Sequence, residues 1–210
     1  MAHESRNALQ RNQACLSVLA LRLQARPEEL ALLTRMQRAQ DDLHRLYEDV
    51  REYAGPVTVD RRTCRLAALC REAWDSLAPQ RADQRARLHL VPLGVDWECS
   101  ADPFLLKQVF RNLLENALAA GSDRVEISFA ADRHAARDTV RIVMRDNGPG
   151  FTAEQRQKLF EPFHTTKVRG TGLGLAICKR IVEAHGGRIE ASDSPGPGAE
   201  ITIQLPRREA

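Results

Sequence analysis

The sequence predicts an α-helical hairpin followed by an α/β domain, in which one mixed, largely antiparallel sheet carries its helices on one face. Residues 1–54 contain no glycine and a single proline, as expected of long helices. The run Ala54-Gly55-Pro56 then interrupts this helical composition. Beyond it, segments with the periodicity of strands and of helices alternate. We therefore expect two domains, residues 1–54 and 55–210.

Two helices are expected in the first domain, near 3–24 and 28–53, with a turn at 25–27. Proline at position 27 suits the first turn of the second helix, where its missing N–H costs nothing. Apolar side chains recur every seven residues along both helices, at Leu9, Leu16 and Leu23 and at Met36, Leu43 and Val50. A two-helix hairpin cannot cover such stripes, whereas two copies that form a four-helix bundle can. We predict a homodimer through residues 1–54; the alternative is that the stripes pack on the rest of the chain.

The second domain alternates short strands and helices. We expect strands near 57–59, 87–91, 95–99, 124–130, 139–145, 188–192 and 200–205. We expect helices near 63–78, 103–120 and 172–185. A polar turn at 131–138 separates the two longest strands, and Pro195-Gly196-Pro197-Gly198 turns the final hairpin.

Composition excludes several classes of protein. The 31 basic and 28 acidic residues give a net charge of +3 and are interspersed, so no nucleic-acid partner is expected. No run of 18 apolar residues and no secretory signal occur, so we expect no membrane contact within this chain. The five cysteines lack the spacing of a zinc site or a disulfide framework. A cytoplasmic protein with buried thiols is the resulting expectation.

Two glycine clusters organise the second domain: Asp146-Asn147-Gly148-Pro149-Gly150 and Gly170-Thr171-Gly172-Leu173-Gly174. The second cluster leads directly into an apolar helical pattern. A glycine turn at a helix N-terminus presents free N–H groups and the positive end of the helix dipole, which suits phosphate. Neither the Walker loop nor the dinucleotide fingerprint matches. The ligand expected from the glycines alone is a nucleotide, and the alternative is an ordinary glycine-rich turn.

Asn112 and Asn116 lie four residues apart, hence on one face of the helix near 103–120. Asparagine is a poor helix former, and its amide oxygen can ligate Mg²⁺. The pair therefore predicts either a metal-binding face or two solvated amides.

The order Asn-x-x-x-Asn, Asp-x-Gly-x-Gly, Phe-x-Pro-Phe and Gly-x-Gly-x-Gly resembles the N, G1, F and G2 boxes of sensor histidine kinases. It begins at Asn112 and covers about residues 102–205. These kinases belong to the gyrase, chaperone, kinase and mismatch-repair ATPase superfamily. The resemblance implies the α/β two-layer sandwich of that superfamily for residues 55–210. It also implies that residues 1–54 form the dimerisation and histidine-phosphotransfer hairpin.

The resemblance also implies ATP and Mg²⁺ as ligands. Asn116 would ligate the metal with Asn112 beside it, and Asp146 would accept a hydrogen bond from the adenine amino group. Gly148 and Gly150 would keep the loop under the base open, and residues 160–169 would be a mobile lid. The phosphates would meet Lys167, Gly170, Thr171, Gly172, Leu173 and Gly174. For Lys167 a solvated lid charge is the equal alternative.

His3-Glu4-Ser5-Arg6-Asn7-Ala8-Leu9 resembles the phosphoacceptor box of the same family. His3 would be the nucleophile, Glu4 would take its ring proton or fix its tautomer, and Asn7 would orient water for dephosphorylating a partner. Ala8 replaces the usual proline, which weakens the expected bend in the helix. In the family this helix continues upstream to a sensor, so we expect the chain to be a catalytic fragment.

The resemblance therefore predicts an autokinase that phosphorylates His3, passes the phosphoryl group to an aspartate of a response regulator, and dephosphorylates that regulator. One alternative is an ATP-hydrolysing conformational machine of the gyrase or chaperone branch, which places a glutamate where Asn112 stands. The other is a degenerate kinase that acts as a scaffold or mainly as a phosphatase.

Overall fold

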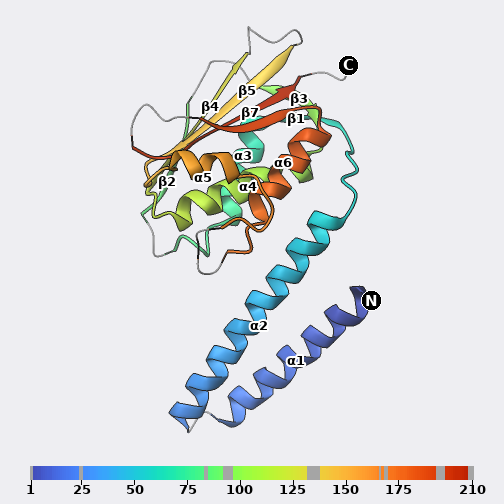
Figure 1. Ribbon diagram of the computed structural model, residues 1–210, viewed down its shortest axis with the longest axis vertical. Coiled ribbons are helices and arrows are strands. Elements are labelled where there is room, and N and C mark those ends of the chain that lie inside the picture. The colour runs from blue at the N-terminus through green and yellow to red at the C-terminus, as the bar shows by residue number, and fades with distance from the viewer. Residues whose placement is uncertain are drawn as a thin grey trace. The chain divides into compact units, whose positions relative to one another are not determined.

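A computed structural model describes residues 2–23, 26–82, 85–91, 97–131, 138–165, 167, 170–192 and 197–207, without the side chains of residues 2–6. The chain divides into two compact units (Figure 1). One unit is Met1–Gly55 with Thr166–Thr171, and the other is Pro56–Thr165 with Gly172–Ala210. Among the described residues, no helix combines the length and the hydropathy that crossing a bilayer requires.

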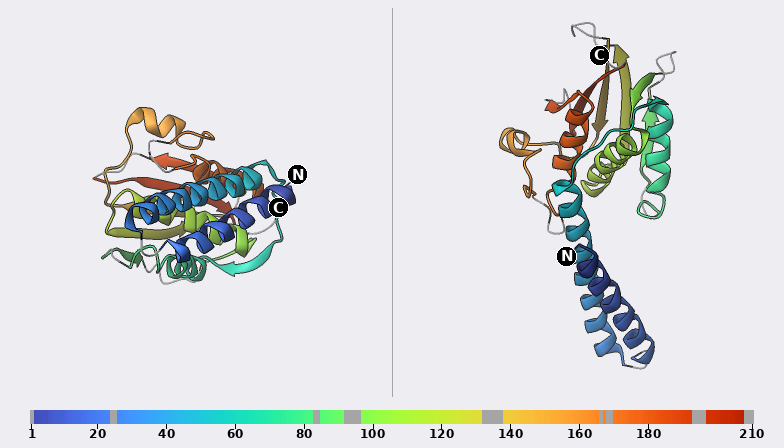
Figure 2. Two further views of the ribbon diagram at one scale, coloured as in Figure 1. Left: turned by 90° about the horizontal axis from the view of Figure 1, so that it is seen from below. Right: turned by 90° about the vertical axis from the view of Figure 1, so that its right-hand side faces the viewer.

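The first unit is built on two long helices, α1 (Ala2–Arg22) and α2 (Pro27–Ala54), which lie side by side and antiparallel (Figures 1 and 2). Proline begins α2 as predicted, and Glu28 and Glu29 in its first turn complement the helix dipole. Leu16 and Leu33 are buried between the helices. The Gln40 amide donates to the Leu9 carbonyl at 2.5 Å and so ties the helices together. The two predicted N-terminal helices are confirmed.

Some side chains of the apolar stripes are buried between the two helices, and others are exposed to solvent. Leu16, from the stripe of α1, is only 4 % exposed. In contrast, large apolar side chains of both helices remain open to solvent, namely Val18, Leu19, Leu21, Leu32, Met36, Leu43, Leu46 and Val50. The hairpin alone therefore leaves a long apolar surface unburied.

The second unit contains a five-stranded sheet in the order β2-β4-β5-β7-β6. Its strands are β2 (Arg87–Leu90), β4 (Arg124–Ala131), β5 (Thr139–Asp146), β6 (Arg188–Ser192) and β7 (Glu200–Pro206). β2 runs parallel to β4, and every other neighbouring pair is antiparallel. A separate two-stranded sheet pairs β1 (Arg62–Arg65) with β3 (Glu98–Ala101). The predicted mixed, largely antiparallel sheet is confirmed.

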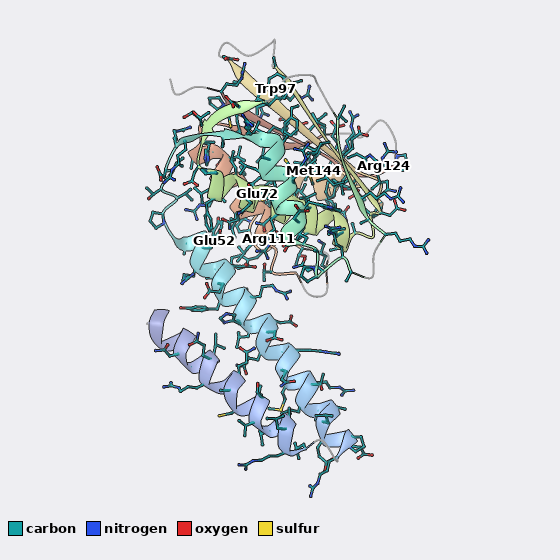
Figure 3. The ribbon with its side chains drawn as sticks, turned by 180° about the vertical axis from the view of Figure 1, so that it is seen from behind. Glu52, Glu72, Trp97, Arg111, Arg124 and Met144 are labelled. Carbon is teal, nitrogen blue, oxygen red and sulfur yellow. The ribbon has the colours of Figure 1, made fainter. Side chains whose placement is uncertain are left out.

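Three helices, α3 (Leu66–Ser76), α4 (Pro103–Ala119) and α6 (Gly174–Ala184), cover one face of this sheet (Figures 1 and 2). Val140, Ile142 and Met144 alternate along β5 and are buried toward these helices. Met144, labelled in Figure 3, belongs to this layer of side chains. The unit is thus an α/β two-layer sandwich.

Several predicted boundaries were wrong. Residues 57–59 form no strand; pairing begins at Arg62, because the backbone N–H of Asp60 instead donates to the Asp102 carboxylate at 3.0 Å. The next helix accordingly starts at Leu66 rather than at 63. A short helix, α5 (Ala153–Lys158), was not predicted; Thr152 and Gln155 begin it with a reciprocal capping box. Most of the predicted turn at 131–138 lies outside the described residues.

Candidate functional site

Asp146 ends β5 and is the centre of a polar network. It follows Met144 by two residues, so its side chain leaves the sheet on the face that the helices cover. Its Oδ1 accepts hydrogen bonds from Ser122 Oγ at 3.1 Å, from the N–H of Gly148 at 2.8 Å and from the N–H of Ala199 at 3.3 Å. Among the described residues no donor contacts Oδ2. One oxygen therefore holds the carboxylate in place, and the other is available to a ligand.

Asn147 braces the same loop, a role that the sequence analysis missed. Its Oδ1 accepts from the N–H groups of Asp123 and Arg124, each at 3.1 Å, and its Nδ2 donates to Asp123 Oδ1 at 2.6 Å. Arg124 opens β4 and is labelled in Figure 3. An asparagine directly after a strand commonly bonds to nearby backbone, and this was the signal available in the sequence.

The glycines after Asp146 are required by the protein's own packing. A Cβ on Gly148 would lie 2.7 Å from Ser122 Oγ and 2.9 Å from Asp146 Oδ1. Gly198, in the last turn, has a φ of +109° and a Cβ there would lie 1.7 Å from the Asp146 carbonyl oxygen. Gly150, with its own positive φ, packs against the Gly198 carbonyl. The protein's own atoms therefore require glycine at these three positions, whether or not a ligand is bound.

Ser122 also links this carboxylate to α4. Its side chain is 3 % exposed, and its N–H donates to the Ala117 carbonyl oxygen at 3.2 Å. Ala117 follows Asn116, which is half-buried on α4. The end of α4 that bears Asn116 is thereby tied to the strand that bears Asp146.

Asn112 connects α4 with the start of α6. Its Nδ2 donates to the Gly174 carbonyl oxygen at 3.3 Å. Leu173, the residue before α6, is fully buried and offers no side-chain cap, so only its backbone could meet a ligand. The first N–H groups of α6 receive no capping side chain from that residue, which leaves them suited to an anion.

The start of α6 is also joined to the segment around Phe163. The Phe163 N–H donates to the Gly172 carbonyl oxygen at 3.1 Å. Gly172 has a φ of +70° and lies against the backbone of Phe163. Phe163 itself has a positive φ of 63° and an exposed ring.

The remaining predicted residues lie in the first unit. Lys167 is exposed, and its carbonyl oxygen accepts from the Gly170 N–H at 3.3 Å. Thr171 Oγ1 donates to the Asp49 carboxylate at 2.6 Å. Asn7 is exposed on α1.

His3 and Glu4 belong to α1 by their backbone, and their side chains lie outside the described residues. Together with Asn7 they form the predicted phosphoacceptor group.

A second polar cluster lies at the N-terminal end of α4 and was also missed. Asp102 caps α4, and its carboxylate accepts from the N–H groups of Phe104, Leu105 and Asp60. Burial acts to raise the pKa of Asp102, but these three hydrogen bonds outweigh it and leave the pKa below its ordinary value. The cluster fixes the helix end and needs no ligand.

His185 completes this cluster from the end of α6. Its Nε2 accepts from the Asp102 N–H at 3.0 Å, and its Nδ1 lies 2.7 Å from the Ile181 carbonyl oxygen, so the ring is neutral with the proton on Nδ1. Burial is the main cause that lowers the pKa of His185. Arg61 closes the group by donating to the carbonyl oxygens of Ser100 and His185, each at 3.1 Å.

Comparison with known proteins identifies relatives of both units. Residues 101–209 match the family described as histidine kinase-, DNA gyrase B-, and HSP90-like ATPase. The chain is 34% identical over 206 residues to the sensor histidine kinase ZraS of Klebsiella oxytoca, which covers 98% of this chain and 44% of that protein. The chain thus spans less than half the length of this relative.

Solved structures share the fold. The catalytic domain of histidine kinase ThkA superposes with a TM-score of 0.60 and 29% identity, covering 71% of this chain and 97% of that one. Full-length ShkA in complex with AMPPNP gives a TM-score of 0.75 at 24% identity, covering 100% of this chain and 45% of that one. At that identity the likeness to ShkA concerns the fold alone.

Proposed function

Because this chain belongs to the family of histidine kinase-, DNA gyrase B- and HSP90-like ATPases, we propose that it is a protein-histidine kinase that takes the γ-phosphoryl group of ATP onto His3. One observation carries this choice within the family. The similarity to the sensor histidine kinase ZraS extends over 98% of the chain and so includes the N-terminal helices as well as the ATP-binding unit. The homology supports residues 1–54 as the dimerisation and phosphotransfer domain and residues 55–210 as the catalytic domain.

Asp146 is the proposed adenine contact. Its Oδ2 would accept from the adenine amino group, while Oδ1 stays engaged with Ser122, Gly148 and Ala199. Guanine carries a carbonyl at the corresponding position, and a carboxylate cannot donate to it. This arrangement favours ATP over GTP.

Phosphate binding is assigned to the second glycine cluster and the start of α6. Backbone N–H groups of Gly170, Thr171, Gly172, Leu173 and Gly174 are the proposed donors. Lys167 would add a positive charge beside a phosphate oxygen. The lack of a side-chain cap from Leu173 at the start of α6 supports this assignment.

Mg²⁺ is the expected metal. The residues present fit a site in which protein oxygens and the phosphates of the nucleotide would bind it together, rather than a site made of protein side chains alone. Among the described residues no group of three or more His, Cys, Asp or Glu side chains could hold a metal ion. Mg²⁺ is commonly bound through few protein oxygens together with substrate phosphates. Asn116 would supply the protein oxygen, and Asn112 orients the facing segment through Gly174. When bound, the metal would neutralise charge on the phosphates.

The transfer step uses the N-terminal residues. A ring nitrogen of His3 attacks the γ-phosphorus, the bond to the β,γ-bridging oxygen breaks, and ADP leaves with that electron pair. Glu4, adjacent in sequence, would accept the proton of the other ring nitrogen. The phosphoryl group then passes to an aspartate carboxylate on the receiver domain of a response regulator.

Asn7 lies one helical turn after His3 and is exposed. In the proposed phosphatase reaction, its amide would orient the water that hydrolyses the aspartyl phosphate of the response regulator. We place the chain's activity in the cytoplasm, where ATP is available.

A homodimer through residues 1–54 is proposed to complete the first unit. The exposed stripe that includes Met36, Leu43 and Val50 supports it, because a second hairpin would bury these side chains in a four-helix bundle. Light scattering at micromolar concentration tests this proposal. A monomer at that concentration would contradict it.

The rival functions are an ATP-hydrolysing conformational machine and a degenerate scaffold. Asn112 cannot act as a general base, and its amide is already bonded to Gly174. Glu115, the nearest carboxylate on α4, pairs instead with Arg111 at 2.9 Å and with Gln80 at 3.3 Å. This engagement disfavours hydrolysis by activated water.

The test is incubation with γ-labelled ATP and Mg²⁺ for the chain, for His3→Gln and for His44→Gln, a matched change on the same hairpin. We expect acid-labile, base-stable label in the chain and in His44→Gln, and its loss in His3→Gln. Label that persists in His3→Gln would contradict the acceptor assignment. Steady phosphate release without label would favour the ATPase, and ATP binding with neither would favour the scaffold.

A further inference from the structure

Two cysteines that lie 35 residues apart in sequence meet in the small sheet of the second unit. Cys64 of β1 and Cys99 of β3 are directly opposite each other in the antiparallel register. Their Sγ atoms are 3.8 Å apart, and the Cys64 Sγ also lies 3.5 Å from the Cys99 carbonyl oxygen. Both side chains are buried and both are free thiols.

The backbone around the pair already suits a covalent link. Directly opposed residues of an antiparallel pair have Cα atoms about 4.5–5.5 Å apart, which lies within the roughly 4.4–6.8 Å range of disulfides. The sulfur atoms would have to approach from 3.8 Å to about 2.05 Å, a movement that rotation of the two side chains can supply.

We propose that Cys64 and Cys99 form an oxidation site at which a small peroxide, such as hydrogen peroxide, converts the dithiol into an intrachain disulfide. The site lies outside the ATP-binding and phosphotransfer residues and does not depend on their assignment. Burial restricts the oxidant to a small, uncharged molecule and excludes a bulky disulfide such as oxidised glutathione.

The two thiols have different roles in this reaction. The hydrogen bond between the two thiols is the main cause that lowers the pKa of Cys64; the same hydrogen bond, together with burial, raises the pKa of Cys99. Cys64 is therefore the attacking thiolate. It displaces hydroxide from the peroxide and becomes a sulfenic acid, and Cys99 then attacks that sulfur and releases water. In total, two thiols lose two protons and two electrons, and one peroxide becomes two water molecules.

The other three cysteines do not offer this arrangement. Cys15 is exposed on α1, where it can react singly or between molecules. Cys70 is buried on α3, and burial raises the pKa of its thiol and so suppresses the thiolate. Cys178 is likewise buried, on α6. The disulfide would enclose residues 64–99, which include α3 and β2, and such a loop closure stabilises the folded state.

The test uses the full chain with Cys15→Ser, which removes the exposed thiol. This protein is compared with the same chain carrying Cys64→Ser or Cys99→Ser. After hydrogen peroxide, thiols are counted in denaturant, the intact mass is measured, and a non-reducing digest is mapped. We expect the count to fall from four to two, the mass to fall by about 2 Da from two lost hydrogens, and dithiothreitol to reverse both changes.

The digest should contain a peptide that joins Cys64 to Cys99, and the oxidised chain should melt on the order of 5 °C higher. Neither serine variant should lose a pair of thiols. The proposal is overturned if Cys64 and Cys99 both remain alkylatable under these conditions, if they gain oxygen without a cross-link, or if the linked peptide joins another pair. Faster closure by oxidised glutathione than by peroxide would overturn the assignment of the oxidant.

Discussion

Replacing Asp146 by asparagine distinguishes the roles of the two oxygens of its carboxylate. The amide oxygen of Asp146→Asn can keep the three hydrogen bonds that Oδ1 accepts from Ser122, Gly148 and Ala199. The amide nitrogen then occupies the position of Oδ2 and cannot accept a hydrogen bond from adenine. We therefore expect a folded protein that has lost its base contact.

The expected loss follows from the kind of bond that is removed. A hydrogen bond to a charged group contributes about 1.5–3 kcal/mol, which corresponds to an increase in the Kd for ATP of roughly 10- to 150-fold. The affinity for GTP should fall less, because the new amide can donate to the guanine carbonyl. The preference for ATP over GTP should therefore narrow.

The assay is calorimetric titration with ATP and with GTP in the presence of Mg²⁺, together with a thermal melt of the free protein. Asp75→Asn is the matched control, since Asp75 is exposed on α3 and the change is chemically identical. We expect that control to bind ATP as the parent does. Unchanged ATP affinity in a folded Asp146→Asn protein would refute the assignment of Asp146 to the base.

Two further predictions concern stability. Gly198→Ala should lower the free energy of unfolding by about 3 kcal/mol or more, through a positive φ and a Cβ aimed at the Asp146 carbonyl. Gly121→Ala, with a φ of +83° and open space around it, should cost only about 1 kcal/mol in a urea titration, and equal costs would contradict the packing argument. Burial lowers the pKa of His185 in the folded state, so the unfolded chain binds the proton first as pH falls below about 6.5. Stability should drop by up to about 1.4 kcal/mol between pH 7.5 and 5.5, and a His185→Gln protein with the same slope would disprove this origin.

Local patterns predicted the elements well where they were long and uniform. The two N-terminal helices were predicted correctly. Their sequence has no glycine and a single proline, and it repeats apolar residues every seven positions. The strand predicted at 57–59 was wrong because the local sequence carries no sign of the hydrogen bond between Asp60 and Asp102, 42 residues away. Tertiary contacts of this kind decide where a short strand begins.

The same limit applies to the site. The motif around Asp146 predicted a ligand-binding carboxylate, which remains a proposal. It could not predict that Ser122, 24 residues earlier, and Ala199, 53 residues later, both donate to one of its oxygens. The Cys64–Cys99 pair was missed for the same reason, since only the register of β1 on β3 brings the two thiols together.

The polar cluster at the start of α4 has a practical consequence for cutting the chain into fragments. The family match begins at residue 101, but Asp60 and Arg61 already bond to Asp102, Ser100 and His185 inside the second unit. A fragment that began at the family boundary would also expose the buried flank of α4, against which α3 packs. An ATP-binding fragment intended for expression on its own should therefore begin no later than Pro56, where the compact unit begins.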